Sequence, residues 1–427
     1  MNARTPRHIA VIGSGPAGCF TGQALRRHWK DAEITIFDRL AAPYGLIRYG
    51  VAADHQHTKA VTRQFDRNFS SGDFRFAGNV EVGTDIDLDS IRAEFDIVVL
   101  ATGRWRDRTL TVPGAHLDGV LVSGDIVNAL NTVPRPNIPM PAIGQNVVVI
   151  GAGNVALDMV RFLIKTAADY MDSDVSPEAL DSYLSSPATH VTVLSRSPIA
   201  SAKADVAMIR ELGKVPGVRI TVANSSPATE DNTLGRKREA AFAELASQEV
   251  VEARAHVHFV FGATPSRIGG TQHVETVHLS AAPAGEASVI PADTVISAIG
   301  FDVNAQGHWH YAEEYDFTPS DDLGRIGPGL YRSGWLKRGP VGAIPANRSD
   351  AHQVAKEIIA DFESADSPST TTGGYEALPR ALRNQAVDFA DWRRIDAAEL
   401  ANADESRIRR KFHDHEDMLA AAQSQNP

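Results

Sequence analysis

The sequence predicts an α/β protein made of two Rossmann-like domains and a helical C-terminal extension. A glycine-rich turn at residues 13–18 directly follows the short apolar strand expected at His8–Ile12. A second glycine-rich turn at residues 151–156 follows the strand expected at Asn146–Ile150. The chain has 427 residues, of which 43% are hydrophobic, and this suffices for roughly two or three domains.

Composition removes several classes of function. Lysine and arginine number 42 against 53 aspartates and glutamates, so the net charge of −11 disfavours broad binding to nucleic acid. The single cysteine, Cys19, excludes an internal disulfide and a cysteine-rich metal site, and we expect no metal. No apolar run approaches the ~18 residues that span a bilayer, and residues 1–7 lack the apolar core of a secretory signal. We therefore expect a cytoplasmic protein without a membrane span.

The first turn has the full context of a dinucleotide-binding motif: strand, GxGxxG, helix, strand and acid. Gly13 permits the tight turn, Gly15 lets the backbone approach a pyrophosphate, and Gly18 lets the helix pack closely. Asp38, 25 residues after Gly13, is placed to bind a ribose 2′-hydroxyl and to repel a 2′-phosphate. The alternative is a structural glycine turn. The residues expected to bind FAD or NAD here are Gly13, Gly15, Pro16, Ala17, Gly18 and Asp38.

The second turn lacks the acid that accompanies the first. Gly151 and Gly153 occupy the first two glycine positions, and the later strand at residues 191–194 ends in Arg196 and Ser197 instead of an acid. An arginine there can bind a 2′-phosphate, which favours NADP over NAD, although a solvated arginine at a strand end is the alternative.

Two turns, one followed by an acid and one by a base, indicate two different dinucleotides, most economically FAD first and NADP(H) second. A pyridine nucleotide gives up two electrons as a hydride, and a flavin can pass them on singly. Two further expected strands lead to Gly103 and Gly300, where glycine lets the chain pass close to a cofactor.

With these motifs in place, the sequence resembles the adrenodoxin-reductase type of ferredoxin–NADP reductase. The resemblance extends over about residues 7–362 and rests on four segments in family order. They are residues 13–18 with Asp38, 43–55 (PYGLIRYGVAADH), 149–158 (VIGAGNVALD) and 334–348 (GWLKRGPVGAIPANR). The chain departs from the family pattern at Ala53, where proline is usual, and at Asp38, where glutamate is more common.

The resemblance implies roles at matching positions. His55 and Glu211 match a family histidine and glutamate near the flavin, which would relay a proton or offset charge; the alternative is that they only fix local structure. Leu46 and Val82 would line the FAD site, and Trp335, Gly342, Ala343 and Ile344 would hold the flavin ring and meet the nicotinamide. Gly45 and Gly103 are further residues that we expect to bind a cofactor. The NADP pyrophosphate would contact Asn154 and Val155.

The NADP site departs from the family at two positions. Ser197 stands where a second arginine is usual, and Met208 stands where a glutamate is usual. Loss of one guanidinium removes a phosphate clamp, so we expect weak discrimination between NADP and NAD.

The resemblance also implies an acidic ferredoxin-like partner, which an acidic protein must receive on a local basic patch. Two clusters are candidates: Arg26-Arg27, and Arg236-Lys237-Arg238. A solvated helix face is the alternative for each.

We expect a discontinuous FAD domain at residues 1–106 and 300–362, and an NADP domain at residues 107–299. A linker and C-terminal extension follow at residues 363–427, where a helical WxxIDxxE segment is expected to pack on the flavin domain or on a partner subunit. Two other functions stay open: electron input like that of the glutamate synthase small subunit, although its cysteine-rich segments are missing, or a non-catalytic FAD-binding redox sensor.

Overall fold

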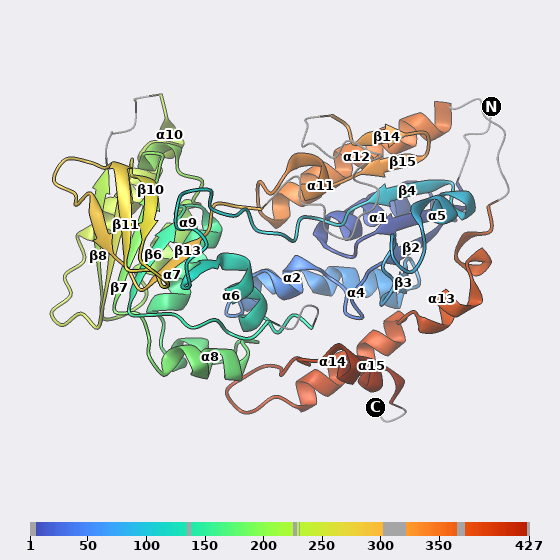
Figure 1. Ribbon diagram of the computed structural model, residues 1–427. Coiled ribbons are helices and arrows are strands. Elements are labelled where there is room, and N and C mark those ends of the chain that lie inside the picture. Colours follow the sequence, from blue (N-terminus) through green and yellow to red (C-terminus); the bar gives the residue numbers. More distant parts are fainter. Residues whose placement is uncertain are drawn as a thin grey trace.

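The computed structural model describes residues 6–134, 138–224, 229, 231–301, 322–364 and 372–424. It contains two six-stranded, mainly parallel sheets in two separate bodies (Figure 1). The first sheet has the order β14-β15-β4-β1-β2-β3, and the second has the order β5-β13-β6-β7-β9-β8. This confirms the predicted α/β fold class with two Rossmann-like units.

The first sheet is covered on both faces, which is why its strands are nearly continuous apolar runs. In β1, Ile9 and Val11 pack with helices α1 (Pro16–His28) and α12 (Ile344–Ser364), whereas Ala10 and Ile12 face α5 (Leu88–Glu94). The strands are β1 (His8–Ile12), β2 (Glu33–Phe37), β3 (Arg75–Ala77), β4 (Ile97–Leu100), β14 (Arg325–Gly327) and β15 (Leu330–Arg332).

The second sheet has helices on one face and a small antiparallel sheet on the other. Val147 and Val149 of β6 belong to the helical core, whereas Val148 and Ile150 belong to the cluster under the small sheet. The strands are β5 (Val120–Val122), β6 (Asn146–Ile150), β7 (His190–Ser195), β8 (Val218–Asn224), β9 (Ala255–Phe261) and β13 (Thr294–Ser297). The helices are α6 (Ser123–Leu130), α7 (Asn154–Ile164), α8 (Pro177–Leu184), α9 (Val206–Leu212) and α10 (Thr233–Ala246). The small sheet is β10 (Thr264–Gly269), β11 (Thr276–Ala281) and β12 (Val289–Pro291).

The C-terminal extension is helical and lies along the body that holds the first sheet (Figure 1). Trp392, Ile395 and Met418 belong to the same hydrophobic core as β1 and α1. The WxxIDxxE segment lies in α14, which begins with a capping box of Asp388 and Asp391. The helices of the extension are α13 (Arg380–Gln385), α14 (Phe389–Ala401) and α15 (His415–Gln423).

The remaining elements are short, apart from α4, and connect the larger ones. They are α2 (Leu46–Tyr49), α3 (Gln56–Lys59), α4 (Thr62–Ser70), α11 (Trp335–Arg338), η1 (Ala167–Tyr170), η2 (Ile199–Ser201) and η4 (Gly374–Ala377). The domain boundaries stay predictions, and parts of them, at residues 302–321 and 365–371, lie outside the described residues. None of the helices in the described part of the chain has both the length and the apolar character needed to cross a membrane.

Candidate functional site

The first glycine turn connects β1 to α1 at the carboxyl end of the first sheet. The Gly13 N–H donates to the Phe37 carbonyl at 2.8 Å, and a Cβ at Gly13 would lie 2.5 Å from the Ala101 carbonyl oxygen. A Cβ at Gly18 would lie 2.0 Å from the Gly13 carbonyl oxygen. Around Gly15 the space is open, since no atom of the described residues other than its chain neighbours comes within 4 Å of where a Cβ would stand. Two glycines thus serve packing, and one borders free space.

Asp38 follows β2 and is hydrogen-bonded to the first glycine turn. Its Oδ2 accepts the Ser14 N–H at 3.0 Å and the Ser14 hydroxyl, and its Oδ1 accepts the Leu40 N–H at 3.0 Å. Burial raises the pKa of Asp38, although these hydrogen bonds oppose the shift. The side chain stays half-buried, so its remaining lone pairs can accept a further hydroxyl.

Two distant segments close on this turn. Gly45 has φ 48°, and a Cβ there would lie 3.1 Å from the Gly15 Cα. A Cβ at Gly334, which precedes α11, would lie 2.3 Å from the Ala17 Cβ. Glycine is therefore required at both positions to let the chain segments approach α1.

The segment after Gly334 carries the other residues expected at the flavin. Trp335 lies 5.4 Å from Phe301, ring centre to ring centre, and its indole N–H donates to the Gly342 carbonyl at 3.4 Å. Gly342 has φ 80°, and Ala343 precedes α12, which begins at Ile344.

The other residues expected near the flavin have less uniform positions. Leu46 begins α2 and is half-buried, and Gly103, with φ 70°, follows β4 and borders open space. Val82 is buried with Ile12 in the hydrophobic core on the face of the first sheet that α5 covers, opposite α1 and α12.

The second turn repeats the geometry of the first. The Gly151 N–H donates to the Leu194 carbonyl at 2.9 Å, and a Cβ at Gly151 would lie 2.4 Å from the Ala298 carbonyl oxygen. Among the described residues other than its chain neighbours, a Cβ at Gly153 would meet only the Lys203 side chain, at 3.9 Å. Ala156 replaces the third glycine and is fully buried.

The side chains around the second turn are more accessible. Arg196 and Ser197 are exposed after β7, and Val155 is half-buried in the first turn of α7. Asn154 donates through Nδ2 to the Asp205 carboxylate at 2.7 Å and accepts the Asp205 N–H through Oδ1 at 2.8 Å. The reciprocal pair ties the start of α7 to the start of α9.

Lys203 is a residue that the sequence motifs missed. It is exposed, and its Cβ is the lysine atom that lies 3.9 Å from the Cβ position of Gly153. A lysine therefore stands beside the second turn. It lies outside the glycine motif, seven residues after Arg196, so no local pattern marks it.

His55 and Glu211, which are 156 positions apart, meet across the two bodies. His55 precedes α3, Glu211 lies on α9, and His55 Nε2 is 3.0 Å from Glu211 Oε2. On the other side of the ring, Nδ1 lies 4.0 Å from Asp158 Oδ1. Arg161 is 3.6 Å from Glu211 and 3.2 Å from Asp158. The histidine therefore faces two carboxylates, and the Arg161 guanidinium lies against both of these carboxylates.

Helix α7 supplies one side of this cluster. Asn154, Asp158, Arg161 and Lys165 follow the spacing of one helical face, a signal that the sequence contains. Arg161 and Lys165 both pair with Asp54 and hold its pKa below the usual value, although burial alone would raise it. Burial raises the pKa of Asp158 to about 6.

The two basic clusters contain residues of different kinds. Arg26 is bound internally, to Asp73 at 3.1 Å and to the Ala32 carbonyl at 2.7 Å, whereas Arg27 is exposed.

Arg238 is likewise bound internally, to the carbonyls of Ala204 at 2.8 Å and Ala200 at 3.1 Å, whereas Arg236 and Lys237 are exposed.

Cys19 is fully buried, and its thiol donates to the Ser14 carbonyl at 3.2 Å. Burial raises the pKa of this thiol, so it stays neutral and packs as a small apolar group.

Known proteins resemble this chain in both sequence and architecture. The family described as pyridine nucleotide-disulphide oxidoreductase matches residues 7–318. A cindoxin reductase of Citrobacter braakii is 40% identical over 97% of this chain and 91% of its own length. A probable ferredoxin/ferredoxin–NADP reductase of Mycobacterium tuberculosis is 32% identical over 99% of this chain and 76% of its own. The solved structure of M. tuberculosis FprA in complex with NADPH superposes with a TM-score of 0.88 at 28% identity, covering 98% and 100% of the two chains.

The chain belongs to the ferredoxin–NADP reductases of the adrenodoxin-reductase type. Membership confirms the resemblance drawn from the sequence and makes the chain an oxidoreductase. Of the two positions singled out at the expected NADP site, Ser197 is exposed and Met208 is half-buried against the core of the second domain.

Proposed function

We propose that this chain binds FAD at the first turn and NADP(H) at the second, and transfers electrons from NADPH to a small acidic iron–sulfur carrier. The observation that carries the proposal is the hydrogen bond between His55 and Glu211, which joins the two dinucleotide domains. When bound, NADPH supplies two electrons together, and FAD accepts them and releases them one at a time. A single buried cysteine suits a reducing compartment, and we propose the cytoplasm.

The first turn fits a tightly held FAD. Helix α1 has neither a side-chain cap nor an acidic residue in its first turn, so its N–H groups are left for a pyrophosphate. Gly15 offers the open backbone, and Asp38 offers an acceptor to a ribose hydroxyl. The residues proposed to contact FAD are Gly13, Gly15, Pro16, Ala17, Gly18, Asp38, Gly45, Leu46, Val82, Gly103, Trp335, Gly342, Ala343 and Ile344.

The second turn fits NADP(H). Helix α7 also lacks a side-chain cap and an acidic residue in its first turn. Arg196 is exposed and free to bind a 2′-phosphate, and Lys203 adds positive charge, which Asp205 partly offsets. With Ser197 in place of a second arginine, the preference for NADP over NAD is small. The residues proposed to contact NADP are Gly151, Gly153, Asn154, Val155, Arg196 and Ser197.

His55 and Glu211 are proposed as the catalytic pair. Glu211 accepts the bond at Nε2 and fixes the orientation of the imidazole ring, so that His55 holds or moves a proton through Nδ1. Asp158, 4.0 Å from Nδ1, supplies a negative charge above a pH of about 6.

The carrier is proposed to dock on Arg27 of α1 and on Arg236 and Lys237 of α10, because these side chains are exposed. Arg26 and Arg238 are bound internally, so they contribute less to the two basic clusters. Because the chain carries a net charge of −11, such docking depends on local attraction that salt screens.

Carrier-dependent turnover tests the function. NADPH-driven reduction of acidic ferredoxins should fall steeply as salt rises. Arg27→Gln and Arg236→Gln should each raise KM for the carrier about threefold, the size expected of one exposed charge pair. Arg75→Gln, an exposed arginine of β3, is the matched control and should leave KM unchanged. A flat salt response would overturn the docking surface, and reduction of none of the ferredoxins would overturn the choice of carrier.

A further inference from the structure

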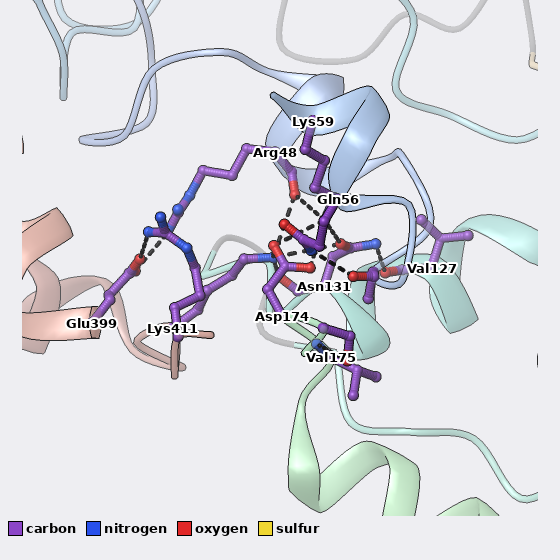
Figure 2. A network of polar contacts seen from close by, with 12 residues as sticks. Arg48, Gln56, Lys59, Val127, Asn131, Asp174, Val175, Glu399 and Lys411 are labelled. Atoms are coloured by element: carbon purple, nitrogen blue, oxygen red, sulfur yellow. Dashed lines mark hydrogen bonds and ion pairs between the residues drawn. The ribbon is translucent and has the colours of Figure 1, made fainter. Parts of the chain in front are cut away.

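A buried cluster of charged side chains lies where the two sheet domains and the C-terminal extension meet (Figure 2). The Lys59 ammonium donates to both carboxylate oxygens of Asp174, at 2.8 and 2.9 Å, and Lys411 lies 3.0 Å from the same carboxylate. Both lysines also reach Asn131 Oδ1, at 2.9 and 3.5 Å. The Lys411 side chain is 0% exposed and that of Asp174 4%. We call these four residues the junction.

Each part of the molecule contributes to the junction. Lys59 ends α3, in the segment of the first domain that also carries His55. Asn131 follows α6, and Asp174 precedes α8, so both belong to the second domain, while Lys411 comes from the extension. The junction is thus a contact among the first domain, the second domain and the C-terminal extension.

The extension is anchored firmly in the first domain. Trp392 of α14 lies in its hydrophobic core, and Glu399 of α14, fully buried, pairs with the buried Arg48 of α2 (Figure 2). Arg48 also lies over the Trp392 ring, 4.9 Å from its centre.

The same extension is bonded along the second domain. The Ile408 N–H donates to the Ser173 carbonyl at 3.0 Å, and the Asp172 N–H donates to the Ser406 carbonyl at 3.1 Å. Residues 406–411 therefore form a strap that leaves the first domain and pairs with residues 172–174 of the second.

The junction also connects to the segment that carries the candidate catalytic histidine. The Asp174 N–H donates to the Ala53 carbonyl at 3.2 Å, two residues before His55. Buried charges tolerate little displacement, because a carboxylate that moves away from its ammonium partners is left unpaired away from water. A small rotation between the domains is therefore opposed at the junction.

We propose that Lys411 is a positioning residue, which fixes the angle between the two domains. This angle sets how the second domain approaches the proposed flavin site of the first domain. The inference rests on the proposed function, because the angle serves electron transfer between the dinucleotides that we propose are bound in the two domains. It goes beyond that function in giving the C-terminal extension a part in the reaction.

Lys411→Met tests the proposal, because it leaves Asp174 paired with Lys59. FAD content and the NADP⁺ dissociation constant should stay within about threefold of wild type, since both glycine turns are intact. Flavin reduction at saturating NADPH should fall about tenfold or more, as expected when reacting groups are held less closely. Hydrogen exchange at the Asp172 and Ile408 amides should accelerate, a readout that does not depend on activity.

Arg410→Met is the matched control, since Arg410 lies on the same strap and makes an exposed ion pair with Glu178. It should leave reduction unchanged. Asn131→Ala keeps every charge of the junction and serves if Lys411→Met loses FAD; it should lower the reduction rate about threefold with the NADP⁺ affinity kept. Reduction at the wild-type rate in these junction variants would overturn the proposal. If wild type itself is not reduced by NADPH, the proposed function fails instead.

Discussion

The first glycine turn, after β1, and the second, after β6, share their backbone contacts. In each, the first glycine donates its N–H to the end of the next strand, at 2.8 Å for Gly13 and 2.9 Å for Gly151. In each, a Cβ would collide with a carbonyl oxygen of a third strand segment, at 2.5 and 2.4 Å. The second glycine borders nearly open space in both.

Their surroundings differ. Around the first turn, Asp38 is half-buried and bonded to Ser14, and Gly45 and Gly334 bring two distant segments against it. Around the second, Arg196 and Lys203 are exposed. The first turn is therefore enclosed by other segments of the chain, whereas the second turn is flanked by exposed cations. The enclosed turn suits a cofactor that stays bound, and the open turn suits a nucleotide that exchanges.

The largest expected effect comes from Gly151→Val. The side chain would strike the Ala298 carbonyl and displace the second turn, so flavin reduction by NADPH should fall about 100-fold or more. FAD should remain bound, and dithionite should still bleach it, because the first turn is untouched. A variant that loses FAD would show that the two turns are not independent.

A smaller effect separates the two cations of the open turn. Arg196→Met should abolish the small preference for NADPH, so that the ratio of kcat/KM for NADPH over NADH falls to about one, because a charge-assisted hydrogen bond to the 2′-phosphate is lost. Lys203→Met is the matched comparison: Lys203 stands beside Gly153, where we propose that the pyrophosphate shared by both nucleotides binds, so kcat/KM should fall equally for NADPH and NADH. An unchanged ratio in Arg196→Met would contradict the assignment of NADP to this turn.

The smallest effect concerns Asp158, in the charged cluster around His55. Burial raises the pKa of Asp158 to about 6, so its charge, 4.0 Å from His55, is present above that pH and lost below it. Flavin reduction should rise about fivefold from pH 5 to pH 7, which corresponds to roughly 1 kcal/mol between charges at this distance in a water-like surrounding. Asp158→Asn should remove this step. A pH profile identical to wild type would exclude Asp158 from the relay.

The sequence predicts the turns well because each is local: strand, glycines and helix lie within about 20 contiguous residues. The contact of His55 with Glu211 follows only from the family resemblance, since no spacing rule joins residues 156 positions apart. Neither a local motif nor the family resemblance predicts the junction, because Lys59 meets Asn131 and Asp174 at separations of 72 and 115 positions without any motif. The basic clusters were only partly predictable, since the exposure of Arg27 and the internal bonds of Arg26 depend on the packing of α1.

Anaerobic mixing of the desalted wild-type protein with NADPH tests the central claim most directly, by following protein-bound flavin absorbance. The account predicts that FAD survives desalting at about one per chain and that NADPH bleaches it within seconds. Flavin that washes out with added NADP⁺, or bound flavin that dithionite bleaches and NADPH does not, would contradict an enclosed turn and an open turn working as a pair.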